Sequence, residues 1–125
     1  MRLLLDTQVV LWALAGDDRL RPTTRERIAD GATDVSVSAA SVWEITIKQA
    51  LGKLAAPADL VEALAAAEFR PLDINADHAL AAGRLPRHHD DPFDRMLVAQ
   101  AVIDGLTLVT ADRRLTAYGV PLLAA

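Results

Sequence analysis

Leu3-Leu4-Leu5-Asp6 is the segment that decides the expected fold. Three consecutive apolar residues predict a short strand that is buried on both faces, as in parallel sheets covered by helices. The stretch from Thr7 to Ala15 then predicts a mostly apolar helix that ends at Gly16. Because a charge at the end of a buried strand needs a partner, Asp6 is a candidate functional residue at the sheet edge.

Strands and helices are expected to alternate along the rest of the chain. Further strands are predicted at Val35–Ser38, Phe69–Leu72, Leu106–Val109 and, as an edge strand containing Pro121, Val120–Leu123. Further helices are predicted at Thr23–Ile28, Ser41–Leu51, Ala58–Glu68, Asn75–Ala82 and from Pro92 up to Gly105. This order predicts an α/β fold, a three-layer α/β/α sandwich around a central, mostly parallel sheet.

Length and composition limit the classes of protein that remain. A chain of 125 residues predicts a single domain over 1–125, and 52% hydrophobic residues exclude a disordered protein. Zero cysteines exclude a disulfide scaffold and cysteine catalysis. We find no apolar run long enough for a membrane helix and no signal peptide, so a cytoplasmic protein is expected. The net charge of −4 argues against a protein that coats nucleic acid, but not against a nuclease whose acids bind metal ions.

Four acidic residues lie where a strand gives way to a helix. Asp6 and Asp112 follow predicted strands, while Glu44 and Asp94 lie in the first predicted turn of later helices. Since the carboxyl ends of parallel strands meet at one sheet edge, these acids are expected to converge. Clustered carboxylates repel one another and favour a hard divalent cation such as Mg²⁺ or Mn²⁺, the usual apparatus of phosphodiester hydrolysis.

Each acid taken singly also has a purely structural interpretation. Ser41-Val42-Trp43-Glu44 matches a capping box, and Asp91 before Pro92 is a favourable N-cap. Asp94 gains from the helix dipole, and Asp112 can cap the turn that follows it. For single residues both interpretations remain open, and only the joint pattern favours a metal site.

The motifs Leu-Leu-Leu-Asp6-Thr7, Ser41-Val42-Trp43-Glu44-Ile45, Asp91-Pro92-Phe93-Asp94-Arg95 and Val109-Thr110-Ala111-Asp112 resemble those of the PIN-domain family. Within that family the chain resembles the VapC-type toxins of bacterial toxin–antitoxin pairs. The resemblance implies a Mg²⁺- or Mn²⁺-dependent ribonuclease whose catalytic and metal-binding residues are Asp6, Glu44, Asp94 and Asp112. It also implies a small cognate antitoxin and a homodimer, and the almost wholly apolar first helix favours burial against such a partner.

Several further residues are candidates for supporting roles. The same resemblance implies that Thr7 and Thr110 support the acids, the Thr110 hydroxyl by hydrogen-bonding a carboxylate or a metal-bound water, and Asp91 is a further candidate for this role. Thr7 is equally a candidate cap of the first helix. Contacts with RNA phosphates are predicted for four arginines that flank the site, with surface solubility alone as the alternative: Arg87, Arg95, Arg113 and Arg114.

Two histidines and two tryptophans are assigned structural positions. Since adjacent side chains rarely reach one ion, His88 and His89 are expected to be solvated loop residues, with RNA contact or pH-dependent activity as the alternative. Trp12 and Trp43 are expected in the core or an interface. The rival to the enzyme is a non-catalytic PIN-like scaffold that binds RNA or protein, and activity with and without EDTA separates the two.

Overall fold

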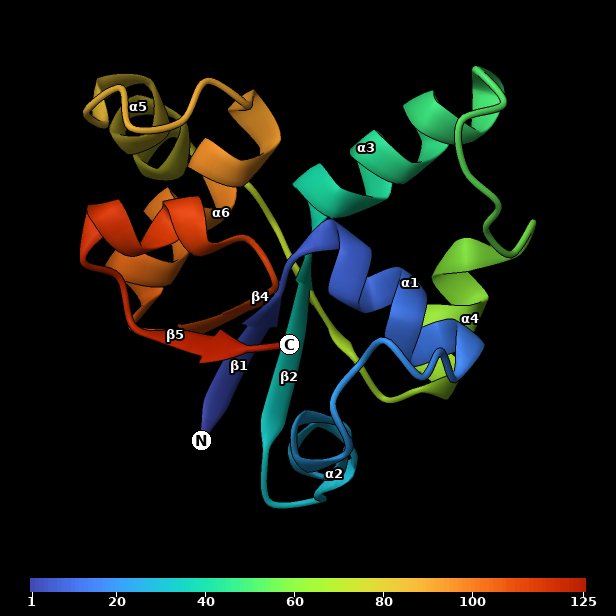
Figure 1. Cartoon of the computed structure of the whole chain (residues 1–125). Coiled ribbons are helices and arrows are strands. Elements are labelled where there is room, and N and C mark those ends of the chain that lie inside the picture. The colour runs from blue at the N-terminus through green and yellow to red at the C-terminus, as the bar shows by residue number, and fades with distance from the viewer.

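The computed structural model describes all residues from 1 to 125 and contains one five-stranded sheet (Figure 1). Its strands are β1 (Arg2–Leu5), β2 (Asp34–Ser38), β3 (Arg70–Leu72), β4 (Thr107–Thr110) and β5 (Leu122–Ala124). Every pairing is parallel and the strand order is β3-β2-β1-β4-β5. The α/β class is confirmed, and the sheet is parallel throughout.

Six α-helices and one 3₁₀ helix connect these strands. They are α1 (Thr7–Ala15), α2 (Pro22–Ala29), α3 (Ala39–Ala50), α4 (Leu60–Ala66), α5 (Ala76–Arg84), α6 (Pro92–Asp104) and the 3₁₀ helix η1 (Arg113–Tyr118). The predicted start of α3 is wrong, because Ser38 is its N-cap and accepts a hydrogen bond from the Ala40 amide. Helix α5 also extends beyond its predicted end at Ala82, through Gly83 to Arg84.

The leucines of β1 divide the core into two layers. Leu3 and Leu5 belong to an apolar cluster that includes Val9 and Val10 of α1 and Leu64 of α4. Leu4 belongs to a second cluster on the other face, which includes residues of α6 and η1. All three leucines are fully buried, so the strand is covered on both faces as its sequence predicts. Figure 1 shows α1, α2 and α4 on one side and α5 and α6 on the other, which confirms the three-layer sandwich.

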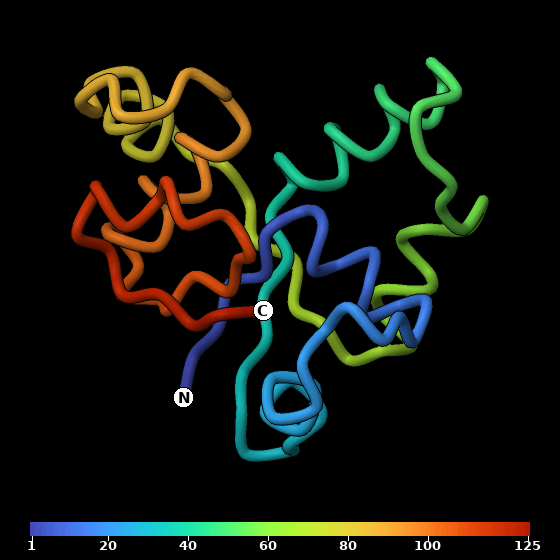
Figure 2. Tube along the Cα trace, viewed as in Figure 1, coloured from blue at the N-terminus to red at the C-terminus, as the bar shows by residue number.

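The central strands end at the same level of the sheet. In the registers of the sheet Leu5 pairs with Val37 on β2 and with Val109 on β4. The residues that follow these strands therefore share one edge, where α1 and α3 begin (Figure 2). Separately, no helix of the structure is long and apolar enough to cross a membrane.

Candidate active site

A cavity of about 350 Å³ opens at this carboxyl edge of the sheet. All four predicted acids line it, together with other residues that include Thr7, Gln8, Lys48, Asp91 and Ala111. Acids up to about a hundred residues apart in sequence therefore face a common space, as parallel strand ends require.

Asp6 is buried, and each of its carboxylate oxygens accepts a hydrogen bond. One carboxylate oxygen accepts from the Val9 amide at 2.9 Å and caps α1, while the other accepts from the Thr110 hydroxyl. Burial raises the pKa of Asp6 despite these two hydrogen bonds. Asp6, not Thr7, is thus the cap of α1, and the capping role is compatible with a place in the acidic cavity.

The supporting hydroxyls join separate elements around Asp6. Thr110 Oγ1 also accepts from the Asp112 amide at 3.0 Å, so one threonine links two of the acids. Thr7 Oγ1 donates to Ser41 Oγ at 3.0 Å and ties α1 to α3. The contact between Thr110 and a carboxylate is the one that its place in the sequence predicts.

Glu44 lies in the second turn of α3 because that helix begins early. Its buried carboxylate therefore makes no capping box and instead contacts Lys48 Nζ at 2.6 Å, one turn further along the helix. This hydrogen bond raises the pKa of Lys48, which keeps the ammonium charged. Lys48 was missed in the sequence, although its i,i+4 spacing from Glu44 is the ordinary signal for such a pair.

Asp91 and Asp94 occupy the beginning of α6. Asp91 is the N-cap and accepts from the amides of Phe93 at 2.8 Å and Asp94 at 3.4 Å, as predicted. Burial and then the charge of Asp91 raise the pKa of Asp94 from 3.8 to about 7. A carboxyl group with so high a pKa is one whose ionised form lacks sufficient positive charge nearby.

Asp112 differs from Asp94 in its electrostatic surroundings. Arg114 holds it with two parallel contacts, Nε to Oδ1 at 3.0 Å and Nη2 to Oδ2 at 2.8 Å. This bidentate contact with Arg114 lowers the pKa of Asp112, so the carboxylate stays ionised. Asp112 also caps η1 through the Arg114 amide, as its structural interpretation predicts.

The expectation that both histidines are solvated is wrong for His89. Its ring is buried, with Nε2 at 3.1 Å from Asp112 Oδ2 and 3.3 Å from Asp94 Oδ2. His88 is exposed and meets the Tyr118 ring edge-on at 5.1 Å between ring centroids. The ring of His89 thus lies between two predicted metal ligands, which the adjacency of the two histidines in sequence conceals.

The four predicted arginines occupy different positions. Arg87 and Arg113 are exposed at the surface, and Arg114 binds Asp112. Arg95 instead points back into the fold, where its two terminal nitrogens donate to main-chain carbonyls at the end of α5 and in the loop that follows. The main contacts are with Ala82 at 3.0 Å, Leu85 at 2.9 Å, Pro86 at 3.1 Å and His89 at 3.3 Å.

Replacing Arg95 by Met is therefore expected to lower the free energy of unfolding by about 2 kcal/mol, because carbonyls bonded to a charged group lose their donor. Arg113→Met, at an exposed position, is the matched control. This variant is expected to change the free energy of unfolding by less than about 0.5 kcal/mol. Urea denaturation of the two variants measures both values. Equal stability of the two variants would show that the carbonyl contacts of Arg95 contribute nothing.

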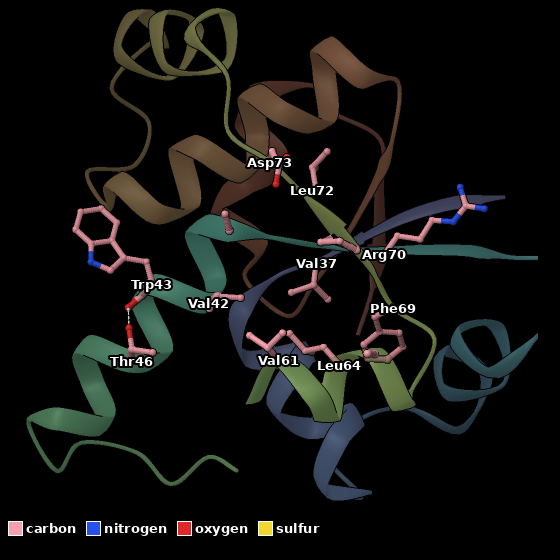
Figure 3. A pocket seen from close by; sticks show the side chains of 13 residues that line it. Val37, Val42, Trp43, Thr46, Val61, Leu64, Phe69, Arg70, Leu72 and Asp73 are labelled. Carbon is pink, nitrogen blue, oxygen red and sulfur yellow. Dashed lines mark hydrogen bonds between the residues drawn. The ribbon is translucent and has the colours of Figure 1, made fainter. Parts of the chain in front are cut away.

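A second cavity, apolar and of about 480 Å³, lies apart from the acids between β2, α3, α4 and β3 (Figure 3). Trp43 borders it and is 63% exposed, so the core position considered for this residue is wrong. Its ring contacts Phe93 edge-on at 5.5 Å between centroids. Trp12, in contrast, packs against the core, and Val9 and Val10 of the same helix are fully buried, so much of the apolar surface of α1 is used within the chain.

Comparison with known proteins identifies the family of the chain. A family model of the PIN domain matches residues 3–121. The chain belongs to the PIN-domain family. The sequence of this PIN protein is 33% identical over 121 residues to Ribonuclease VapC22 of Mycobacterium tuberculosis, covering 94% of this chain and 92% of the relative.

Solved structures share the fold of this PIN protein. VapBC2 from Rickettsia felis, bound to a DNA fragment from its promoter, matches with a TM-score of 0.69 and 15% identity over 99% of this chain and 98% of that one. DNA-bound VapBC from Salmonella typhimurium matches with a TM-score of 0.65 and 17% identity at the same coverage. The predicted PIN-like architecture is confirmed.

Proposed function

We propose that this PIN protein is a metal-dependent endoribonuclease that acts as the toxin of a toxin–antitoxin pair. The observation that carries the proposal is the convergence of Asp6, Glu44, Asp94 and Asp112 on one cavity at the carboxyl edge of the sheet. The similarity to Ribonuclease VapC22 supports RNA as the substrate. We further propose that residues 1–125 form a single PIN domain and that it acts on cytoplasmic RNA.

The chemistry of the acids fits a divalent cation. Burial raises the pKa values of Asp6 and Asp94, so the cluster lacks positive charge that a cation would provide. Four carboxylates offer only oxygen ligands, which suit Mg²⁺ or Mn²⁺. We propose these four side chains as the groups that hold the ion. When bound, such an ion neutralises the scissile phosphate and promotes attack by water.

Residues in and around the cavity bind and orient the substrate in this proposal. Lys48 provides an ammonium beside Glu44, and Arg114 a guanidinium beside Asp112, so positive groups flank the acids on two sides. Arg87 and Arg113 are exposed and available to phosphates further along the RNA. Thr110 holds Asp6 in one orientation, and Asp91 fixes the beginning of α6, which carries Asp94.

The test is cleavage of defined RNA by the purified protein with Mg²⁺, with Mn²⁺ and with EDTA. We expect cleavage with either ion, none with EDTA, and products that end in 5′-phosphate and 3′-hydroxyl groups. RNA that is bound but never cut in the presence of the ions would favour the non-catalytic scaffold. Products with cyclic phosphates would exclude direct attack by water.

Lys48→Gln is expected to weaken RNA binding at all sequences and to reduce the slope of log K against log salt by about 1, because one phosphate contact is lost. Lys53→Gln, an exposed lysine outside the cavity, is the matched control. Fluorescence anisotropy with labelled RNA between low and moderate salt measures both slopes. An unchanged slope for Lys48→Gln would remove this lysine from the RNA-binding groups.

We also propose two protein partners, a small cognate antitoxin and a second copy of the chain. The antitoxin is supported by structural neighbours that were solved as VapBC assemblies. A homodimer is supported by exposed apolar residues on α3, α5 and α6, namely Trp43, Ile47, Leu80, Val102 and Ile103. Sedimentation at increasing concentration tests the dimer, and a monomer at all concentrations would contradict it.

A further inference from the structure

His89 is fixed on both sides of its ring. Its Nδ1 accepts a hydrogen bond from the Asp91 amide at 3.0 Å. A ring nitrogen that accepts a hydrogen bond carries no proton, so the proton of the neutral imidazole must reside on Nε2. That Nε2 faces Asp112 Oδ2 at 3.1 Å and Asp94 Oδ2 at 3.3 Å.

We propose that His89 is a positioning residue, whose Nε2–H donates to Asp112 and faces Asp94 at 3.3 Å, so that it holds the two carboxylates beside each other, and that His89 itself is not a metal ligand. This role rests on the proposed function of the cavity. It joins an acid of α6 to an acid that precedes η1, two elements that approach each other only in the folded chain. Without this N–H between them, the like charges of the two carboxylates would drive them apart.

The alternative is a mixed site in which His89, Asp94 and Asp112 all bind the ion. Their ligand atoms do lie within 4.8 Å of one another, which is close enough for one cation. Metal binding through Nε2, however, needs its lone pair and therefore places the proton on Nδ1. That proton would point at the Asp91 N–H, and the amide would lose its acceptor. The contacts of His89 therefore support a role as hydrogen-bond donor and not as metal ligand.

The position of the ring does not depend on the carboxylates alone. The His89 amide donates to the Tyr118 hydroxyl at 3.0 Å, and the His89 carbonyl accepts from Arg95 Nη1 at 3.3 Å. The ring itself is buried. A donor held in this way can orient the acids beside it, as hydrogen-bonding neighbours of metal ligands commonly do.

Glutamine and alanine at position 89 distinguish the two roles. Glutamine keeps an N–H donor but has no imidazole nitrogen for a metal or for proton transfer, whereas alanine has neither. We expect His89→Ala to lower kcat and to weaken Mn²⁺ binding by about 10- to 100-fold each, with little change in KM for RNA. We expect His89→Gln to restore most of both losses. His88→Gln, at the exposed neighbouring histidine, is the matched control and is expected to behave as the wild type.

Mn²⁺ binding is measured by electron paramagnetic resonance on the full chain without RNA, and thermal unfolding verifies that each variant folds. In the wild type we expect no imidazole nitrogen coordinated to Mn²⁺ in the pulsed spectrum. A coordinated nitrogen that His89→Gln abolishes, or a glutamine variant that binds Mn²⁺ as weakly as the alanine variant, would overturn the proposal. If the wild type binds Mn²⁺ without cutting RNA, the proposed function fails while these spectra still decide the role of His89.

Discussion

Asp6→Asn is expected to reduce RNA cleavage by about a thousandfold or more, a loss of about 4 kcal/mol in transition-state stabilisation. Asparagine has the shape of aspartate but no negative charge for the proposed cation. Its side-chain oxygen still caps α1 through the Val9 amide, so the helix is expected to begin at the same residue. Initial rates on a labelled RNA in Mg²⁺ measure the change.

The stability of the same variant separates loss of chemistry from loss of folding. Burial raises the pKa of Asp6, so the ionised carboxylate is unfavourable in the folded protein without a cation. Replacing it by a neutral amide removes that penalty, and the free energy of unfolding without metal is expected to stay equal or rise. Asp18→Asn, in an exposed loop, is the control and should retain full activity. Wild-type cleavage rates in folded Asp6→Asn would remove Asp6 from the catalytic residues.

Much of the fold was predictable because it depends on local patterns. The unbroken run Leu3-Leu4-Leu5 predicts burial on both faces, and the structure places these leucines alternately in the two apolar layers. Gly16 and Gly105 adopt positive φ and end α1 and α6, where the sequence places the ends of these helices. The convergence of the four acids follows from the same logic, because parallel strands in register end at one edge.

The start of α3 shows where local patterns fail. Both Ser38 and Ser41 are followed by helix-compatible residues, and the Ser41-to-Glu44 spacing favours the later cap. The strand β2 ends at Ser38, so the chain turns into the helix there and Ser41 becomes part of it. This shift of three residues frees Glu44 from capping and leaves its carboxylate facing Lys48.

The positions of His89 and Arg95 could not be predicted from the sequence, because their contacts are made by tertiary structure. The loop before α6 has no periodicity that orients a side chain. His89 is held by Tyr118, 29 residues later, and Arg95 by carbonyls at the end of α5. The sequence favours a solvated loop position for His89 and RNA contact for Arg95, and only the folded chain reveals that donors of both residues are used inside it.

Divalent cations are expected to stabilise the protein strongly at pH 8 and much less at pH 6. The pKa of Asp94 is raised to about 7 in the cation-free protein, mainly by burial. Because a cation binds the ionised carboxylate, protons compete with it below that pKa, and its affinity falls by up to about tenfold per pH unit. At a concentration 100 times the dissociation constant, a bound ion stabilises the folded state by about 2.7 kcal/mol.

Without a cation the pH dependence runs in the opposite direction. The folded pKa of Asp94 lies above the ordinary value of 3.8, so between these two values the folded state binds more protons than the unfolded chain. The contribution of Asp94 to stability is therefore fully present at low pH, declines as the pH rises toward about 7, and changes little above it. Thermal unfolding from pH 5 to 8, with EDTA or with Mg²⁺, is expected to give two curves that diverge as the pH rises.

Asp94→Asn provides the decisive comparison for this divergence. The neutral side chain cannot titrate. The part of the decrease in thermal stability between pH 5 and 7 in EDTA that Asp94 causes should therefore disappear. The Mg²⁺ effect at pH 8 should also fall, since one of the proposed ligands has lost its charge. If Mg²⁺ stabilises the wild type equally at pH 6 and pH 8, the group that titrates near neutrality does not bind the ion. Asp94 would then titrate without contacting the ion, and the cation would have to be held by the other three carboxylates.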